Sequence, residues 1–128
     1  MTLREYFESK DGMGILSTAD THGRVNSALY ARPHVIDENT LAFIMRERLS
    51  YRNLQSNPHA CYLFAEDGPG YAGKRLYLTM TGEETNTDVI EKMRRRQRKD
   101  SDCEENKSLV YFRVDRIRPL VGDEDSKG

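Results

Sequence analysis

Apolar and polar positions alternate with a period of two over much of this chain, which is typical of strands with one buried and one exposed face. The alternation is clearest in Arg75–Thr81, where Leu76, Leu78 and Met80 share one face while tyrosine and threonine take the other. Segments rich in β-branched or aromatic residues predict six strands. They are Gly14–Ala19, Val25–Val35, Leu41–Arg46, His59–Ala65, Arg75–Gly82 and Leu109–Val114.

Short polar links separate the first three predicted strands. Thr21-His22-Gly23 and Asp37–Thr40 are rich in residues favoured in tight turns. We therefore expect an antiparallel meander in which the end of Leu41–Arg46 lies beside the start of Val25–Val35. Antiparallel strands with few helices predict a mainly β fold, and closure into a small barrel would remove exposed sheet edges.

Two segments have helical spacing instead. The first residues, Thr2–Ser9, predict a short helix that ends near Ser9–Gly12 and covers one end of the barrel. A second helix, with Val89, Ile90 and Met93 on its apolar side, is expected between Glu83 and Ser108. A third, discussed below, follows the arginines at the end of Leu41–Arg46.

Length and charge limit the functional classes. The chain has 128 residues and predicts a single domain over residues 1–122, with a disordered acidic tail at 123–128. The formal net charge of -1 gives no global field that would favour nucleic acid or a membrane surface. No apolar run approaches membrane-spanning length. Cys61 and Cys103 lack metal or disulfide spacing, so a reducing cytoplasm is expected.

Other polar features carry weaker predictions. The basic run Arg94–Lys99 invites a nucleic-acid hypothesis, but acidic residues follow at once and basic residues suit a helix C-terminus. The three histidines lie in separate elements without ligand spacing, so no metal site is expected. The glycine-rich loop Glu66–Lys74 lacks the phosphate-loop pattern; it is a long hairpin loop or a mobile loop over a site. Lys74 at its end could reach a ligand held by a second subunit.

The segment Leu41–Pro58 predicts an anion site, because a strand that ends in arginines runs into a short helix. The first N–H groups of a helix have no partner within it, and the dipole makes that end partly positive. Ser50 can act as the N-cap or as a hydroxyl donor, and arginine presents phosphate with a planar fork of donors. The residues expected there are Arg46, Arg48, Ser50, Tyr51, Arg52 and Asn53. The alternative is an ordinary surface helix with solvated arginines.

Proline interrupts the second predicted strand. Pro33 has no N–H for a ladder and holds Arg32 extended, so backbone groups nearby could bond to a ligand instead of a strand. A phosphate at the helix start, with a flat polar-edged ring along Tyr30–Pro33, is the arrangement that flavin mononucleotide (FMN) requires. The alternative is a bulge that only curves the barrel.

Four stretches then occur in a familiar order: GILSTADTHGRVNSALYARP, LAFIMRERLSYRNLQSNPHACYLF, GKRLYLTMTGEE and YFRVDRIRPL. Over Met13 to Leu120 the chain resembles the pyridoxamine 5'-phosphate oxidase-like family of FMN-binding split barrels. The resemblance implies a small antiparallel split β-barrel, assembled as a homodimer with FMN between the subunits. It places the phosphate near Arg46, Ser50, Tyr51 and Asn53, and the ring and ribityl chain near Tyr30, Ala31, Arg32, Pro33 and Met45.

The chain also departs from the family oxidases. It has Arg48-Leu49-Ser50 where they have Ser-Arg-Lys, and it lacks tryptophan and their long C-terminal substrate segment. The resemblance therefore implies a flavin-dependent oxidoreductase or reductase on an undefined small molecule, not an oxidase of pyridoxamine phosphate. The alternatives are a non-catalytic FMN protein for electron transfer or storage, and a barrel that has adopted haem through His34 or His59.

Overall fold

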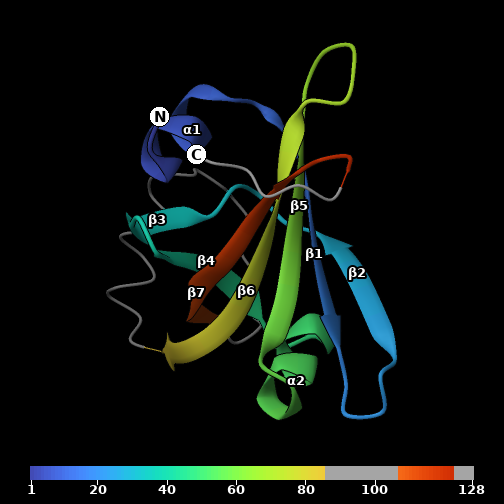
Figure 1. Ribbon diagram of the computed structural model, residues 1–128. Helices are drawn as coiled ribbons and strands as arrows, with labels where there is room; N and C mark the ends of the chain where they lie inside the picture. The colour runs from blue at the N-terminus through green and yellow to red at the C-terminus, as the bar shows by residue number, and fades with distance from the viewer. Residues whose placement is uncertain (86–106, 123–128) are drawn as a thin grey trace.

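A computed structural model describes residues 1–85 and 107–122 of the chain, and in them one antiparallel sheet is flanked by two short helices (Figure 1). The helices are α1 (Leu3–Ser9) and α2 (Leu49–Ser56). The strands are β1 (Gly12–Ala19), β2 (Val25–Leu29), β3 (His34–Asp37), β4 (Thr40–Arg46), β5 (His59–Glu66), β6 (Gly73–Glu84) and β7 (Lys107–Pro119). Their order in the sheet is β2-β1-β5-β6-β7-β4-β3. The predicted small β-barrel fold is confirmed.

The predicted meander is wrong in one respect. The expected continuous strand Val25–Val35 is two strands, β2 and β3, which lie at opposite edges of the sheet. β1 pairs with β2 and β3 pairs with β4, as expected, but β4 then pairs with β7 and not with β2. Pro33 explains the break, because it cannot donate to a ladder and restricts the residue before it.

The break also closes the barrel. Residues 30–33 join the last residue of β2 to the first residue of β3, a path that spans at most about 18 Å even when fully extended. Because β2 and β3 are the two edge strands, the sheet must curl until its edges nearly meet. Residues 30–33 of the predicted strand therefore join the two edges of the sheet, whereas in a flat meander they would continue one strand.

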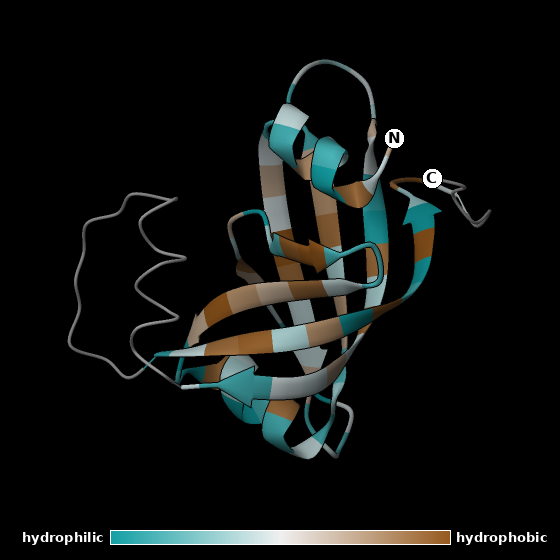
Figure 2. Ribbon diagram, turned by 90° about the vertical axis from the view of Figure 1, so that its left-hand side faces the viewer, coloured by the Kyte–Doolittle hydropathy of each residue, from teal (hydrophilic) through white to brown (hydrophobic). Residues whose placement is uncertain are grey.

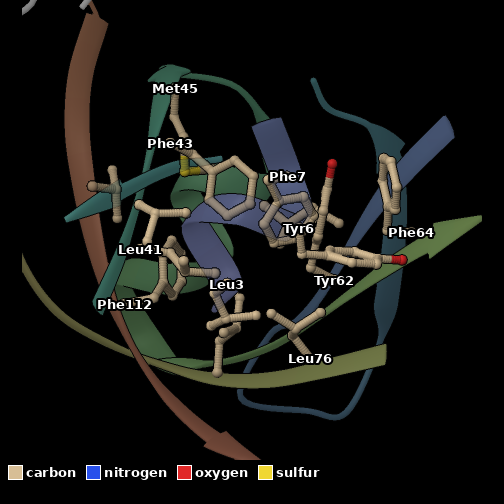
Figure 3. Packing of buried hydrophobic residues seen from close by; sticks show 14 of the residues in the cluster. Leu3, Tyr6, Phe7, Leu41, Phe43, Met45, Tyr62, Phe64, Leu76 and Phe112 are labelled. Carbon is tan, nitrogen blue, oxygen red and sulfur yellow. The ribbon is translucent and has the colours of Figure 1, made fainter. Parts of the chain in front are cut away.

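Buried residues from every strand except β2 fill the barrel, and α1 covers one end (Figure 1). Leu3, Tyr6 and Phe7 of α1 point into this core, where Phe7 packs edge-on against Phe64 with ring centroids 5.4 Å apart (Figure 3). A capping box at Thr2 fixes the start of the helix. The predicted end-covering helix is thus confirmed, ending at Ser9.

The alternation that predicted the strands is visible along the sheet (Figure 2). In β6, Leu76 and Leu78 are buried and Met80 packs against the core, as expected. β6 and β7 are longer than predicted and are joined by two bulges. The loop after Glu66 is the turn of the β5–β6 hairpin, as expected for one of its two interpretations.

Two predictions fall on residues that the structure leaves undescribed. The helix expected between Glu83 and Ser108 lies almost wholly within 86–106, although Glu83 itself belongs to β6 and Ser108 to β7. The tail predicted to be disordered, 123–128, also lies outside the described residues. No helix in the described part of the chain is long and apolar enough to cross a membrane.

Candidate functional site

At the junction of β4 and α2 the helix begins without a capping bond from the side chain of its N-cap residue. The N-cap is Arg48, with extended backbone angles φ -120° and ψ -167°, and its carbonyl accepts the first helical bond from Arg52 N–H at 2.9 Å. Arg48 makes no side-chain capping bond. The expectation that Ser50 could be the N-cap is therefore wrong, since Ser50 lies in the first turn.

Ser50 and Asn53 instead fasten α2 to the barrel. Both are buried, at 4% and 6% exposure. Asn26 Nδ2 of β2 donates to Ser50 Oγ at 3.2 Å, and Asn53 Nδ2 donates to Thr18 Oγ1 of β1 at 3.0 Å. These side chains fix where the helix start points, and their contacts lie on the barrel side of α2.

Tyr30 brings the second predicted strand to this junction. Its ring packs edge-on against Phe43 of β4, with centroids 5.8 Å apart. Burial raises the pKa of the Tyr30 hydroxyl, and the positive charges of Arg48 and Arg46 oppose that rise. Both arginines are therefore close enough to act on the phenol. Three of the predicted features, Tyr30, the arginines and the start of α2, do come together.

Tyr51 connects the same helix start to β6. Its hydroxyl donates to the Glu83 carboxylate, with oxygen–oxygen distances of 2.8 and 3.2 Å. Burial raises the pKa of Tyr51, and the bond to Glu83 raises it further. The negative charges of Glu83 and Glu47 also raise the pKa of Tyr51, so carboxylates as well as arginines lie near the start of α2.

Residues 30–33, called the crossing from here on, lead from β2 to β3 and are held by a tyrosine hydroxyl. Tyr62 Oη of β5 lies 3.0 Å from the carbonyl oxygen of Tyr30 and 3.1 Å from that of Ala31, and donates to them. Burial raises the pKa of Tyr62 far above its usual range, so it remains a donor. Tyr30 N–H donates to Gly14 O at 3.0 Å. The two carbonyls that the sequence left open to a ligand therefore share one donor within the protein, the Tyr62 hydroxyl.

Gly14 makes this arrangement possible. A Cβ at this position would lie 1.9 Å from Tyr62 Oη and 2.7 Å from Tyr30 O. No side chain fits in that space, so β1 can lie this close to the crossing only because residue 14 is glycine. The feature could not be predicted from the sequence, because it depends on two residues that are 48 positions apart in the chain.

The side chains of three residues predicted at the ring have other surroundings in this protomer. Arg32 Nη1 donates to Phe7 O at 3.0 Å and to Lys10 O at 2.6 Å, so its guanidinium holds the C-terminal end of α1. Pro33 is buried. Lys74 Nζ lies 4.8 Å from the centroid of the Tyr6 ring, at the end of the barrel covered by α1.

Met45 lies in β4 directly before the junction. Its side chain is 0% exposed and belongs to the main core. A ligand on the outside of the barrel can therefore meet the backbone of Met45 but not its side chain, unless the core opens.

The exposed face of the edge strand β2 has an apolar residue at each end, with Ser27 between them. Val25 is 78% exposed and Leu29 is 69% exposed. Leu29 lies opposite Ile15 of β1, and Ile15 lies opposite Leu63 of β5, so apolar positions continue across three strands. Among the described residues no group of three or more histidine, cysteine or acidic side chains is placed to hold a metal ion.

Comparison with solved structures identifies the fold. An FMN-binding protein from Syntrophomonas wolfei superposes with a TM-score of 0.78 at 17% identity, over 94% of this chain and 85% of the other. HupZ of Group A Streptococcus gives a TM-score of 0.76 at 16% identity, over 98% and 96%. A candidate pyridoxamine 5'-phosphate oxidase from Lactobacillus delbrueckii gives 0.68 at 17% identity, over 91% and 92%.

At these identities the likeness concerns the fold. The chain has the fold of a group of structures that includes an FMN-binding protein and a candidate pyridoxamine 5'-phosphate oxidase, which is the resemblance predicted from the sequence. No protein-family model matches the chain, and no curated protein matches its sequence.

Proposed function

We propose that this protein is an FMN-binding flavoprotein that works as a homodimer and acts as an oxidoreductase or reductase on a small molecule. One observation carries the proposal: the charges of Arg46 and Arg48 meet the start of α2 beside Tyr30. The fold shared with an FMN-binding protein supports it. The substrate and the electron donor are outside the proposal.

The phosphate of FMN would bind at the start of α2. The first N–H groups of a helix need acceptors, and Arg48 at the N-cap supplies none from its side chain. Arg46 and Arg48 add charge-assisted donors. Ser50 and Asn53 act by holding the helix on the β1–β2 hairpin, while Tyr51 borders the site from its first turn. The residues present therefore fit a terminal phosphate.

The ring would lie along the crossing from Tyr30 to Ala31. Ala31 is exposed and small, and the Tyr62 hydroxyl fixes the path of the backbone beneath it. Arg32 and Pro33 shape this path from the far side, where Arg32 is anchored on α1. Lys74 lies at the α1 end, so its role at the ring belongs to the second subunit. Replacing Lys74 with glutamine should then lower the midpoint potential of the bound flavin, since its charge favours the anionic reduced form.

The same geometry supports the proposal of a homodimer. The barrel is filled by its own side chains, so a flat ring must lie outside it and needs a cover. Exposed Val25 and Leu29 on an edge strand would favour association. A second copy of the chain would cover the ring and would also bury the exposed apolar side chains of β2. Light scattering should give a dimer, and Leu29→Glu should give a monomer that binds FMN poorly; a monomeric wild-type holoprotein would contradict this.

When bound, FMN supplies the redox chemistry. The chain's own residues would hold it, exclude water along the crossing and set the charge around it. No catalytic acid or base is required of them. The test is the absorption spectrum of freshly purified protein before and after NADH or NADPH. Flavin bands that bleach and then recover in air support the reductase, stable flavin bands support a carrier, and a Soret band without flavin would overturn the proposal.

A further inference from the structure

The edge strand β2 is held in the barrel differently from the other strands. It contributes no buried side chain to the core, whereas every other strand contributes at least one. Within the described part of the chain β2 pairs with β1 alone. Segments with few buried contacts have the lowest local stability in a fold. β2 is therefore the strand that a packed partner would restrict most.

The side chains of β2 alternate between two surroundings. Val25, Ser27 and Leu29 are exposed, while the side chain of Asn26 is half-buried and faces the other way. Asn26 Nδ2 donates to Ser50 Oγ at 3.2 Å. One short strand thus carries the apolar side chains proposed for the dimer contact and, next to Val25, a bond to helix α2.

Ser50 lies where the proposed phosphate site begins. It is the second residue of α2 after the N-cap Arg48, so its backbone N–H is one of the first four that have no partner within the helix. Its side chain is buried against the barrel and accepts the bond from Asn26. A shift of Asn26 would therefore move a donor that the phosphate is proposed to use.

The other side-chain contacts from α2 to the sheet reach strands that are paired on both sides. The Tyr51 hydroxyl donates to Glu83 of β6, which lies between β5 and β7. Asn53 donates to Thr18 of β1, which lies between β2 and β5. Among these three contacts, only the one from Asn26 joins the helix start to an edge of the sheet.

We propose that Asn26 is a positioning residue through which dimer formation and phosphate binding strengthen each other. The inference rests on the proposed function, which places a second subunit on β2 and the phosphate of FMN at the start of α2. A partner on Val25 and Leu29 would restrict β2, and Asn26 would pass that restriction to Ser50. The N–H groups of the first turn would then be held ready for the phosphate.

Thermodynamic linkage makes this coupling reciprocal. If dimer formation raises the affinity for the phosphate group, binding of that group must tighten the dimer by the same factor. FMN and riboflavin differ only in the phosphate, so the ratio of the dimer dissociation constants measured with the two ligands reports the coupling itself. Contacts that the ring makes with the second subunit are common to both ligands and cancel from this ratio.

The test is sedimentation of the full chain over a dilution series, with saturating riboflavin or with saturating FMN. In wild type the dimer dissociation constant should be at least about fivefold lower with FMN than with riboflavin, which is the lower end of ordinary coupling between sites. Asn26→Ala should make the two dissociation constants equal, while the value with riboflavin stays as in wild type.

Two further variants separate the coupling from a general loss of stability. Ser50→Ala removes the same bond from the helix side and should also make the two dissociation constants equal. Asn57→Ala removes an asparagine that ties the other end of α2 to the β1–β2 turn, where its Nδ2 donates to Asp20 O at 3.5 Å. This variant should keep the wild-type difference between FMN and riboflavin.

The coupling and the proposed function fail in different ways. A wild-type dimer that binds FMN, but is no tighter with FMN than with riboflavin, overturns the coupling and leaves the proposed function intact. The coupling is also overturned if Asn26→Ala or Ser50→Ala keeps the difference, or if Asn57→Ala loses it. Failure of wild type to bind FMN or to dimerise would overturn the proposed function, and this inference with it.

Discussion

The crossing between the two edge strands should depend on a single hydroxyl. Tyr62→Phe keeps the buried ring and removes the group that donates to the carbonyl oxygens of Tyr30 and Ala31. One hydroxyl proton satisfies one acceptor fully at a time, and the loss leaves a partly buried carbonyl without its donor. We expect a decrease of about 1–2 kcal/mol in the free energy of unfolding.

For a domain of this size that decrease corresponds to a melting temperature lower by about 3–8 °C. The measurement is urea unfolding of the FMN-free protein, followed by circular dichroism, with thermal melts as a second readout. Tyr71→Phe is the matched control, because it removes the same atom from a tyrosine that is 82% exposed and should change stability by less than about 0.5 kcal/mol.

A Tyr62→Phe protein as stable as wild type would show that the hydroxyl does not hold the crossing. The same variant bears on binding, since Tyr30 and Ala31 would line the ring. FMN affinity should fall in Tyr62→Phe and remain at the wild-type value in Tyr71→Phe.

Three further changes test other parts of the structure. Gly14→Ala places a methyl group against the Tyr62 hydroxyl and should lower stability by about 1–3 kcal/mol in urea unfolding; wild-type stability would mean that the crossing has room to move. Arg32→Ala removes the donor to the end of α1 and should speed amide hydrogen exchange in α1 but not in α2, whereas equal exchange would contradict the contact. The bonds from Thr79 and Arg113 hold the pKa of Asp115 below its ordinary value of 3.8, so this carboxylate stabilises the fold above that pH and the contribution is lost as the pH falls through the lowered pKa. Asp115→Asn should therefore flatten the acid limb of stability against pH, and an unchanged acid limb would exclude this role.

The strands could be predicted because burial on one face leaves a period of two in the sequence. Leu76, Leu78 and Met80 face the core as their alternation predicts. The position of the break was also visible, since Pro33 cannot pair in a ladder. The consequence of the break could not be predicted, because a proline does not indicate that the two halves of a strand lie at opposite edges of a sheet. That depends on β7 pairing with β4, a contact between distant segments.

The candidate site was predicted in part. The charges of Arg46 and Arg48 and the helix that follows them are local features, and the structure brings them to Tyr30. The burial of Ser50 and Asn53 is a tertiary feature, set by Asn26 and other residues of the β1–β2 hairpin. Serine is a favoured N-cap, but here the N-cap is Arg48, two residues before Ser50.

The roles of Arg32 and Met45 show the same limit. An arginine next to a proline suggests a ligand, but its donors hold the end of α1. The family resemblance placed Met45 at the ring, but in this protomer its side chain is buried in the core. Both outcomes follow from which face of the barrel a position occupies, and that is fixed only when the sheet closes.

The central claim is that the start of α2, with Arg46, binds a phosphate group. Its most direct test is a paired titration of wild type and Arg46→Gln with FMN and with riboflavin, which differ only in that group. Wild type should prefer FMN by at least about tenfold, and Arg46→Gln should lose about tenfold to a hundredfold in FMN affinity while its riboflavin affinity is unchanged. Equal affinity of wild type for FMN and riboflavin would contradict the account.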